Sequence, residues 1–208
     1  MNKNKNLIRI IIQTAALLLF LVALPIGSWY YLRTGLDYRI AAMEELQTLG
    51  SISDSRFLTP EGGVVDSSLF KGKIVVAAVL TAQNQALFGP VLTKLHDQFD
   101  ERADVLFLLH APSLSYDKEK MHIYFSDYQL FDERQCWLLS TPMEAETTTV
   151  YAMPEASAYP YFALVDAKGM VRRHYDVRNE KDVKRLVEHI ALLLPREKSR
   201  ASSRRQQR

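Results

Sequence analysis

The chain has 208 residues, a formal net charge of +2 and a single cysteine. This length leaves room for one domain of about 150 residues beside a membrane anchor. Residues 196–208 carry six basic residues and one acidic residue, so the rest of the chain is slightly acidic. This excludes an extended nucleic-acid-binding surface on the folded part. A lone cysteine also excludes an intramolecular disulfide and a cysteine-based zinc site within one chain.

The N-terminal stretch predicts a membrane anchor. A basic leader, residues 1–9, precedes an almost wholly apolar run over residues 10–32, which is long enough to cross a bilayer as a helix. Trp29, Tyr30 and Tyr31 close this run as an aromatic belt. A cleaved signal peptide is the alternative, but the run is long for one and no Ala-x-Ala site follows it. The positive leader favours a cytoplasmic N-terminus and a domain on the far side of the membrane.

Residues 33–56 are expected to form a juxtamembrane helix and linker. Residues 36–49 carry an amphipathic stripe that Gly50 ends, and we interpret it as a spacer helix. The stripe consists of Ile40, Met43, Leu46 and Leu49. The folded domain is expected to begin with a β-hairpin, because apolar residues 57–58 and 64–65 flank the turn residues 60–63.

The chain is organised around residues 73–99. An apolar run over residues 73–80 predicts a strand buried on both faces, and a polar loop over residues 81–85 follows it. Apolar residues at helical spacing then predict a helix up to Phe99, with Gly89 and Pro90 at its beginning. In a thioredoxin-type domain such a loop holds the redox cysteines, because the helix N-terminus stabilises a thiolate. This loop contains no cysteine.

The remaining pattern predicts an α/β domain. A second apolar strand over residues 103–110 completes a βαβ unit with a parallel strand pair. Further along we predict a helix over 117–130, a buried strand around 136–139, and a loop over 141–158 with a short element near Val150. Two antiparallel strands follow, over residues 161–166 and 170–175. The last helix is predicted to run from Asn179 to Pro195, with Asp182 in its capping box. The basic tail, residues 195–208, is predicted to be disordered.

This element order, with Pro160 just before a late strand, is typical of an α/β, thioredoxin-like fold, a central mixed sheet flanked by helices. Residues 161–176, Tyr-Phe-Ala-Leu-Val-Asp-Ala-Lys-Gly-Met-Val-Arg-Arg-His-Tyr-Asp, and residues 70–76, Phe-Lys-Gly-Lys-Ile-Val-Val, resemble the SCO/SenC family. The resemblance covers residues 57–194. It implies a protein of the bacterial cytoplasmic membrane whose periplasmic domain helps insert copper into cytochrome c oxidase.

The family's functional residues have no counterparts here. SCO proteins carry a Cys-x-x-x-Cys-Pro loop, and if Pro90 is that proline, Gln85 and Gly89 stand at the cysteine positions. The plain thioredoxin register places Phe88 and Val91 there instead, again without a thiol. The family's copper-binding histidine falls at about Ala158. We therefore expect no catalytic residue, no bound metal and no other cofactor.

Three functions follow as hypotheses. The first is a non-catalytic accessory protein that docks onto an oxidase subunit or a copper chaperone. Its docking face would consist of Gln83, Asn84, Gln85, Gly89, Pro90, Ala158, Tyr159 and Pro160. The thioredoxin-like fold also implies a cis peptide bond before Pro160, whose role we interpret as architectural, a turn that leads into the next strand. The second is an unconventional copper chaperone whose donors would be Met121, His122, Met143 and Met153. The third is a thiol-reactive protein using Cys136, although its apolar surroundings favour an inert, packed thiol.

Overall fold

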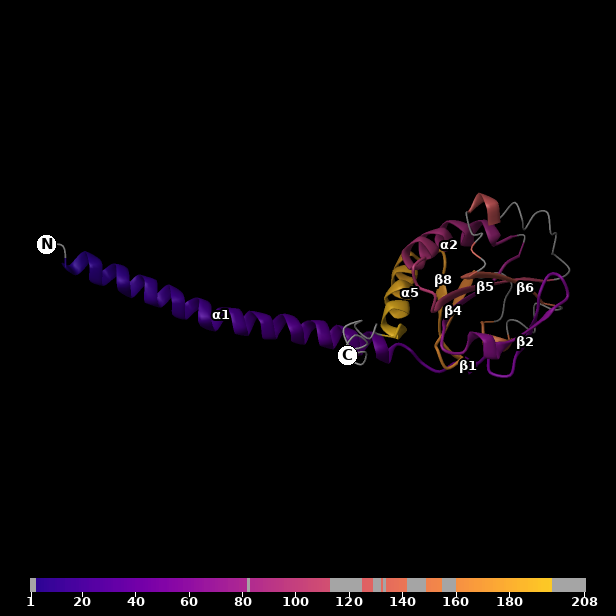
Figure 1. Cartoon of the computed structure of the whole chain (residues 1–208), viewed down its shortest axis with the longest axis horizontal. Coiled ribbons are helices and arrows are strands. Elements are labelled where there is room, and N and C mark those ends of the chain that lie inside the picture. Colours follow the sequence, from indigo (N-terminus) through magenta and orange to yellow (C-terminus); the bar gives the residue numbers. More distant parts are fainter. Residues whose placement is uncertain are drawn as a thin grey trace, which may run out of the picture. The chain divides into compact units, whose positions relative to one another are not determined.

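The computed structural model describes residues 3–81, 83–112, 125–128, 132, 134–141, 149–154 and 160–195 (Figure 1). The chain divides into two compact units, residues 1–44 and residues 45–208. The second unit begins well before residue 57, where the sequence places the start of the domain.

The first unit is one continuous helix, α1 (Lys3–Glu44), of 42 residues. Its length is about 63 Å, roughly twice the thickness of a bilayer core. The part from Leu17 to Glu44 is long and apolar enough to cross a membrane. The predicted spacer helix up to Leu49 is therefore wrong in its extent: it is the end of α1 and stops at Glu44. Beyond that point Leu49 donates its backbone N–H to the carbonyl of Val171 (2.8 Å), so sheet pairing replaces the helix.

The second unit is built on an eight-stranded sheet with the order β1-β8-β7-β4-β5-β6-β2-β3. The strands are β1 (Gly50–Ser51), β2 (Arg56–Leu58), β3 (Val64–Asp66), β4 (Ile74–Val79), β5 (Val105–Pro112), β6 (Cys136–Thr141), β7 (Tyr161–Val165) and β8 (Met170–Asp176). Pairs β4–β5 and β5–β6 are parallel, and the others are antiparallel. The predicted βαβ unit, the β2–β3 hairpin and the antiparallel β7–β8 pair are all confirmed.

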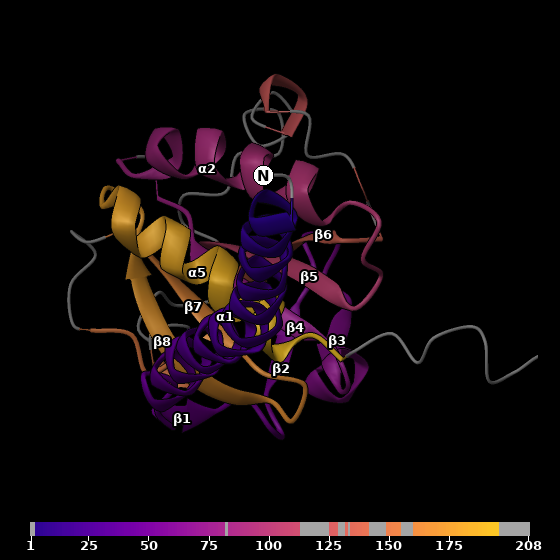
Figure 2. The ribbon, with the colours of Figure 1, turned by 90° about the vertical axis from the view of Figure 1, so that its left-hand side faces the viewer.

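Every residue of β4 is buried because both faces of the sheet are covered. Two helices, α2 (Gln85–Phe99) and α5 (Glu180–Leu193), pack on one face, against Val76, Ala78 and Phe107 among others (Figure 2). The hairpin β2–β3, the 3-10 helix η1 (Ser67–Phe70) and Tyr151 cover the opposite face, where Val75 and Ala77 point. This two-sided burial explains the continuous apolar run of the central strand.

The last helix begins as predicted, with Asn179 as its N-cap: the side chain accepts a hydrogen bond from the N–H of Lys181. Asp182 does not complete a capping box. Its carboxylate instead accepts from the N–H of Asp176 (3.2 Å). The helix predicted over residues 117–130 lies largely outside the described residues, of which 125–127 are helical.

Candidate functional site

The candidate site lies at the end of the sheet where the central strand β4 finishes, at its C-terminal residue Val79. A short loop joins Val79 at the end of β4 to the start of α2. Because β7 runs antiparallel to β4, with Phe162 opposite Ala78, Pro160 lies at this same edge. The topology therefore brings Pro160 and the loop 81–85 together. Ala158, Tyr159 and the peptide bond before Pro160 lie outside the described residues.

Asn84 holds this loop in place. Its side-chain carbonyl accepts a hydrogen bond from the N–H of Thr81 (2.7 Å), and its amide donates to the carbonyl of Val79 (3.1 Å). Asn84 is only 8% exposed. The side chain is thus committed to the loop's own backbone and presents little surface to a partner, in contrast to its predicted place in a docking face.

The helix after the loop begins earlier than the sequence suggests. The N–H of Gln85 already bonds the carbonyl of Thr81 (3.0 Å), and α2 begins at Gln85. Gly89 and Pro90 therefore lie in the second turn, so the prediction that they mark the beginning of the helix is wrong. Proline there leaves the carbonyl of Ala86 without its usual helical donor. The helix begins before the Gly-Pro pair is reached, without a capping hydrogen bond from the side chain of Asn84.

Gly89 lies directly beneath the ring of Tyr128. A Cβ atom placed on Gly89 would lie 2.3 to 2.5 Å from three ring carbons of Tyr128, closer than any real contact. The hydroxyl of Thr93 lies within hydrogen-bonding distance of the carbonyls of both Tyr128 (2.9 Å) and Gly89 (3.1 Å), which links the two segments. The position therefore has no room for a side chain, cysteine included.

The start of α2 presents an apolar surface to solvent. Ala86, Leu87 and Pro90 are exposed, and Leu87 retains 45% of its accessible area. Gln83 is exposed beside them. Where a thioredoxin-type site would place a thiolate at the helix N-terminus, this chain places uncharged side chains without nucleophilic groups.

The single thiol lacks the surroundings of a reactive cysteine. Cys136 is buried in β6, and burial raises its pKa to about 12. A reactive cysteine needs access to solvent and a lowered pKa. The structure therefore contradicts the requirement of the Cys136 hypothesis and agrees with an inert, packed thiol.

The described residues contain no group of three or more His, Cys, Asp or Glu side chains that could hold a metal ion. Of the proposed methionine and histidine donors, Met121, His122 and Met143 lie outside the described residues. Met153 packs, partly buried, against the core. The amide of Asn84 and the covered Gly89 offer no soft donor, so the described part of the candidate site does not fit copper.

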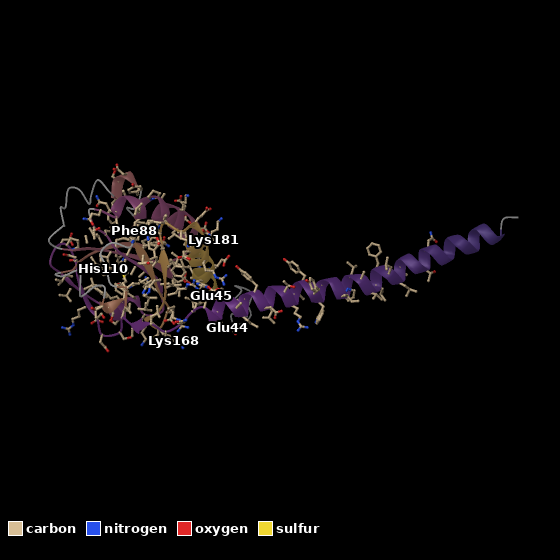
Figure 3. All side chains as sticks on the ribbon, turned by 180° about the vertical axis from the view of Figure 1, so that it is seen from behind. Glu44, Glu45, Phe88, His110, Lys168 and Lys181 are labelled. Atoms are coloured by element: carbon tan, nitrogen blue, oxygen red, sulfur yellow. The ribbon has the colours of Figure 1, made fainter. Side chains whose placement is uncertain are left out.

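The fold gives His110, at the end of the strand predicted over residues 103–110, a partner that the sequence does not reveal. His110, labelled in Figure 3, lies in β5 opposite Val79. Its Nε2 atom lies 2.8 Å from the hydroxyl of Tyr151. The carbonyl of Tyr151 in turn bonds His174 (2.9 Å), and Phe57 stacks on the tyrosine ring. Burial lowers the pKa of His110 to about 3, so its ring is neutral. Only the fold brings Tyr151 to this strand, and no spacing in the sequence signals it.

Comparison with known proteins supports this architecture. No family model matches the chain, and no curated protein matches it either. Among solved structures, the Sco protein BsSco superposes with a TM-score of 0.55 at 15% identity, covering 72% of this chain and 97% of its own. A putative protein disulfide isomerase from Bacteroides thetaiotaomicron gives 0.54 at 18% identity, covering 72% and 91%. The fold is thioredoxin-like.

A SCO1/SenC family lipoprotein from Bacillus anthracis has the same thioredoxin-like fold, with a TM-score of 0.51 at 17% identity, covering 71% of this chain and 94% of its own. BsSco is described as a member of the Sco family of cytochrome c oxidase assembly proteins. At these identities the likeness shows the fold, as predicted. Proteins with this fold are thus described both as an oxidase assembly protein and as a putative disulfide isomerase. This chain has a single cysteine.

Proposed function

We propose that this chain is a redox-inactive, SCO-like protein that acts as a docking factor in assembling the copper site of cytochrome c oxidase. Support comes from the SCO-like pattern of residues 161–176 and from the fold shared with BsSco. In this proposal α1 anchors the protein in the bacterial cytoplasmic membrane. Lys3, Lys5 and Arg9 favour a cytoplasmic N-terminus, and therefore a periplasmic domain.

The observation that carries a docking role is the exposed apolar start of α2. Ala86, Leu87 and Pro90 lie next to one another along the helix surface, at the edge where related folds carry their reactive groups. Apolar side chains exposed together are typical of protein-binding surfaces. Because Tyr128 covers Gly89, this position has no room for a reactive side chain. In this proposal the surface therefore acts by binding a partner and carries out no chemistry. Its partner is a protein, an oxidase subunit or a copper chaperone.

The test is the copper content and activity of the terminal cytochrome c oxidase in a strain lacking this protein. We expect both to fall at limiting copper and to recover with the wild-type gene. Leu87→Asp places a charge on the docking surface and should fail to restore either quantity. The matched control is Leu69→Asp, because Leu69 is also exposed (57%) but lies in η1, on the other face of the sheet.

Membrane levels of both variants are measured by immunoblot, and the comparison uses equal levels. If the deletion leaves copper content and activity unchanged, the link to the oxidase fails. If Leu87→Asp restores the oxidase as well as Leu69→Asp does, the docking surface is wrongly placed.

A further inference from the structure

The part of α1 beyond the aromatic belt carries an apolar stripe that this chain leaves exposed. Leu36, Ile40 and Met43 are 57%, 47% and 44% exposed, respectively. The charged residues Asp37 and Arg39 lie between them in the sequence, so this part of the helix is apolar on one side only. Its spacing of four and then three residues is that of the seam in a coiled coil.

The stripe continues a heptad pattern that runs back through the membrane-spanning part. With Ile40 at position a and Leu36 at position d, seven of the eight seam positions from residue 19 to residue 43 are apolar. The a positions are Leu19, Ile26, Arg33 and Ile40, and the d positions are Val22, Trp29, Leu36 and Met43. Inside the membrane nearly every residue is apolar, so the pattern becomes specific only beyond Leu32. The exception, Arg33, places its guanidinium over the ring of Trp29, 5.2 Å from its centre.

The surface of α1 is hollowed beside this stripe. A shallow hollow on the helix is lined by Leu36, Arg39, Ile40, Met43 and Glu44. In a parallel coiled coil, the side chain at an a position enters a hole formed by one a, one g and two d residues of the facing helix. Those four residues are Ile40, Arg39, and the pair Leu36 and Met43. The hollow thus matches the hole for Ile40 of a second copy.

The charges beside the seam are complementary in the same arrangement. Arg39 occupies position g and Glu44 the following position e, the pair that forms interhelical salt bridges in parallel coiled coils. Neither side chain forms an ion pair with another described residue of the same chain. Isoleucine at position a with leucine at position d favours two strands over three or four. Two copies in one membrane also have the same topology, which makes their helices parallel.

We propose that this protein forms a parallel dimer through a coiled coil of α1 with a second copy, in which Ile40 packs at the seam and Arg39 pairs with Glu44 of the other chain. This dimer is independent of the proposed role in oxidase assembly. It would place two domains side by side on one side of the membrane.

The first test is disulfide trapping of the full-length protein in proteoliposomes. Ile40→Cys and Met43→Cys should form dimers on mild oxidation, whereas Ala41→Cys, which lies off the seam, should not. The wild-type chain is the blank, because its Cys136 is buried. Equal trapping at residues 40, 41 and 43 would overturn the proposed seam, and so would an absence of trapping at 40 and 43.

The second test reverses charges and measures association by energy transfer between labelled copies in vesicles. Arg39→Glu or Glu44→Arg alone should lower the association constant about five-fold, because attraction across two symmetric pairs becomes repulsion. The double change Arg39→Glu with Glu44→Arg restores opposite charges and should recover most of the association. Failure of the double change to recover it, or a monomer in the wild type, contradicts the proposal.

Discussion

At the scale of single residues, the candidate site depends on side chains that bond the backbone. Asn84 makes the loop between β4 and α2 adopt one conformation by bonding two of its main-chain groups. Both partners are main-chain groups at the end of a buried strand. A buried backbone group that loses its partner costs roughly 1–3 kcal/mol.

Asn84→Ala should therefore lower the free energy of unfolding by about 1–3 kcal/mol, since the Thr81 N–H and the Val79 carbonyl lose their partner. Chemical denaturation of the purified protein, followed by circular dichroism, measures this. Gln83→Ala is the control, because Gln83 is exposed in the same loop and should change stability by less than about 0.5 kcal/mol. Similar losses for both variants would contradict the bonding role of Asn84.

His110 makes stability depend on pH. Burial lowers the pKa of His110 to about 3, whereas an unfolded histidine takes up a proton below about pH 6.5. The unfolded state thus binds more protons between these values, and the stabilisation present above pH 6.5 is lost as the pH falls toward 3. The double variant His110→Leu with Tyr151→Phe removes this titration without leaving the tyrosine hydroxyl unpaired.

We expect the double variant to show a slope of stability against pH that is shallower than the wild type's by about 1.4 kcal/mol per pH unit near pH 5. Denaturant unfolding at a series of pH values checks this. Parallel pH curves for the two proteins would show that His110 is not kept neutral in the folded state.

At the scale of elements, the sequence predicts what depends on local pattern. The apolar runs of β4, β5 and β7 predict these strands, because their residues are almost all buried, whereas β8 is predicted as the antiparallel partner that follows a turn. The sequence misplaces the beginning of α2 because no side chain caps the helix at Gln85, while the Gly-Pro pair is a stronger local signal for a helix start. The cover of Tyr128 over Gly89 joins residues 39 positions apart, and no local pattern encodes such a contact.

The packing of Tyr128 on α2 predicts that Gly89→Ala has opposite effects on the free energy of unfolding in the presence and in the absence of the Tyr128 ring. In the wild type, Gly89→Ala should destabilise the protein by about 2 kcal/mol, because the tyrosine ring must move away from the new methyl group. In a Tyr128→Ala background the same change should stabilise by about 1 kcal/mol, because alanine is the better helix former. A double-mutant cycle of unfolding free energies measures both effects. A loss of equal size in the two backgrounds would show that the ring is not the obstacle.

At the scale of the whole molecule, the domain begins at a charged cluster. Glu45, the first residue of the second unit, is labelled in Figure 3. It forms ion pairs with Arg173 of β8 and Arg185 of α5. Arg172 continues this attachment by donating to the carbonyl of Leu46 (3.1 Å) and the hydroxyl of Thr48 (3.0 Å). The first residues of the second unit are thus fixed to the sheet and the last helix of that same unit.

The ion pairs of Glu45 make the stability of the second unit depend on acid. The hydrogen bond that Glu45 accepts from Arg185, together with the charges of Arg173 and Arg185, lowers the pKa of Glu45 from 4.5 to about 2. A lowered carboxylate pKa contributes stability that is present above about pH 4.5 and is lost as the pH falls toward 2. The carboxylate is 37% exposed, so screening by solvent reduces this contribution to about 1 kcal/mol.

Glu45→Gln should lower the free energy of unfolding by that amount at pH 7, and the difference from the wild type should vanish near pH 2. Glu61→Gln, in the exposed turn between β2 and β3, is the matched control and should follow the wild-type curve at every pH. If the Glu45→Gln difference stayed constant from pH 7 to pH 2, the paired carboxylate would not be its source.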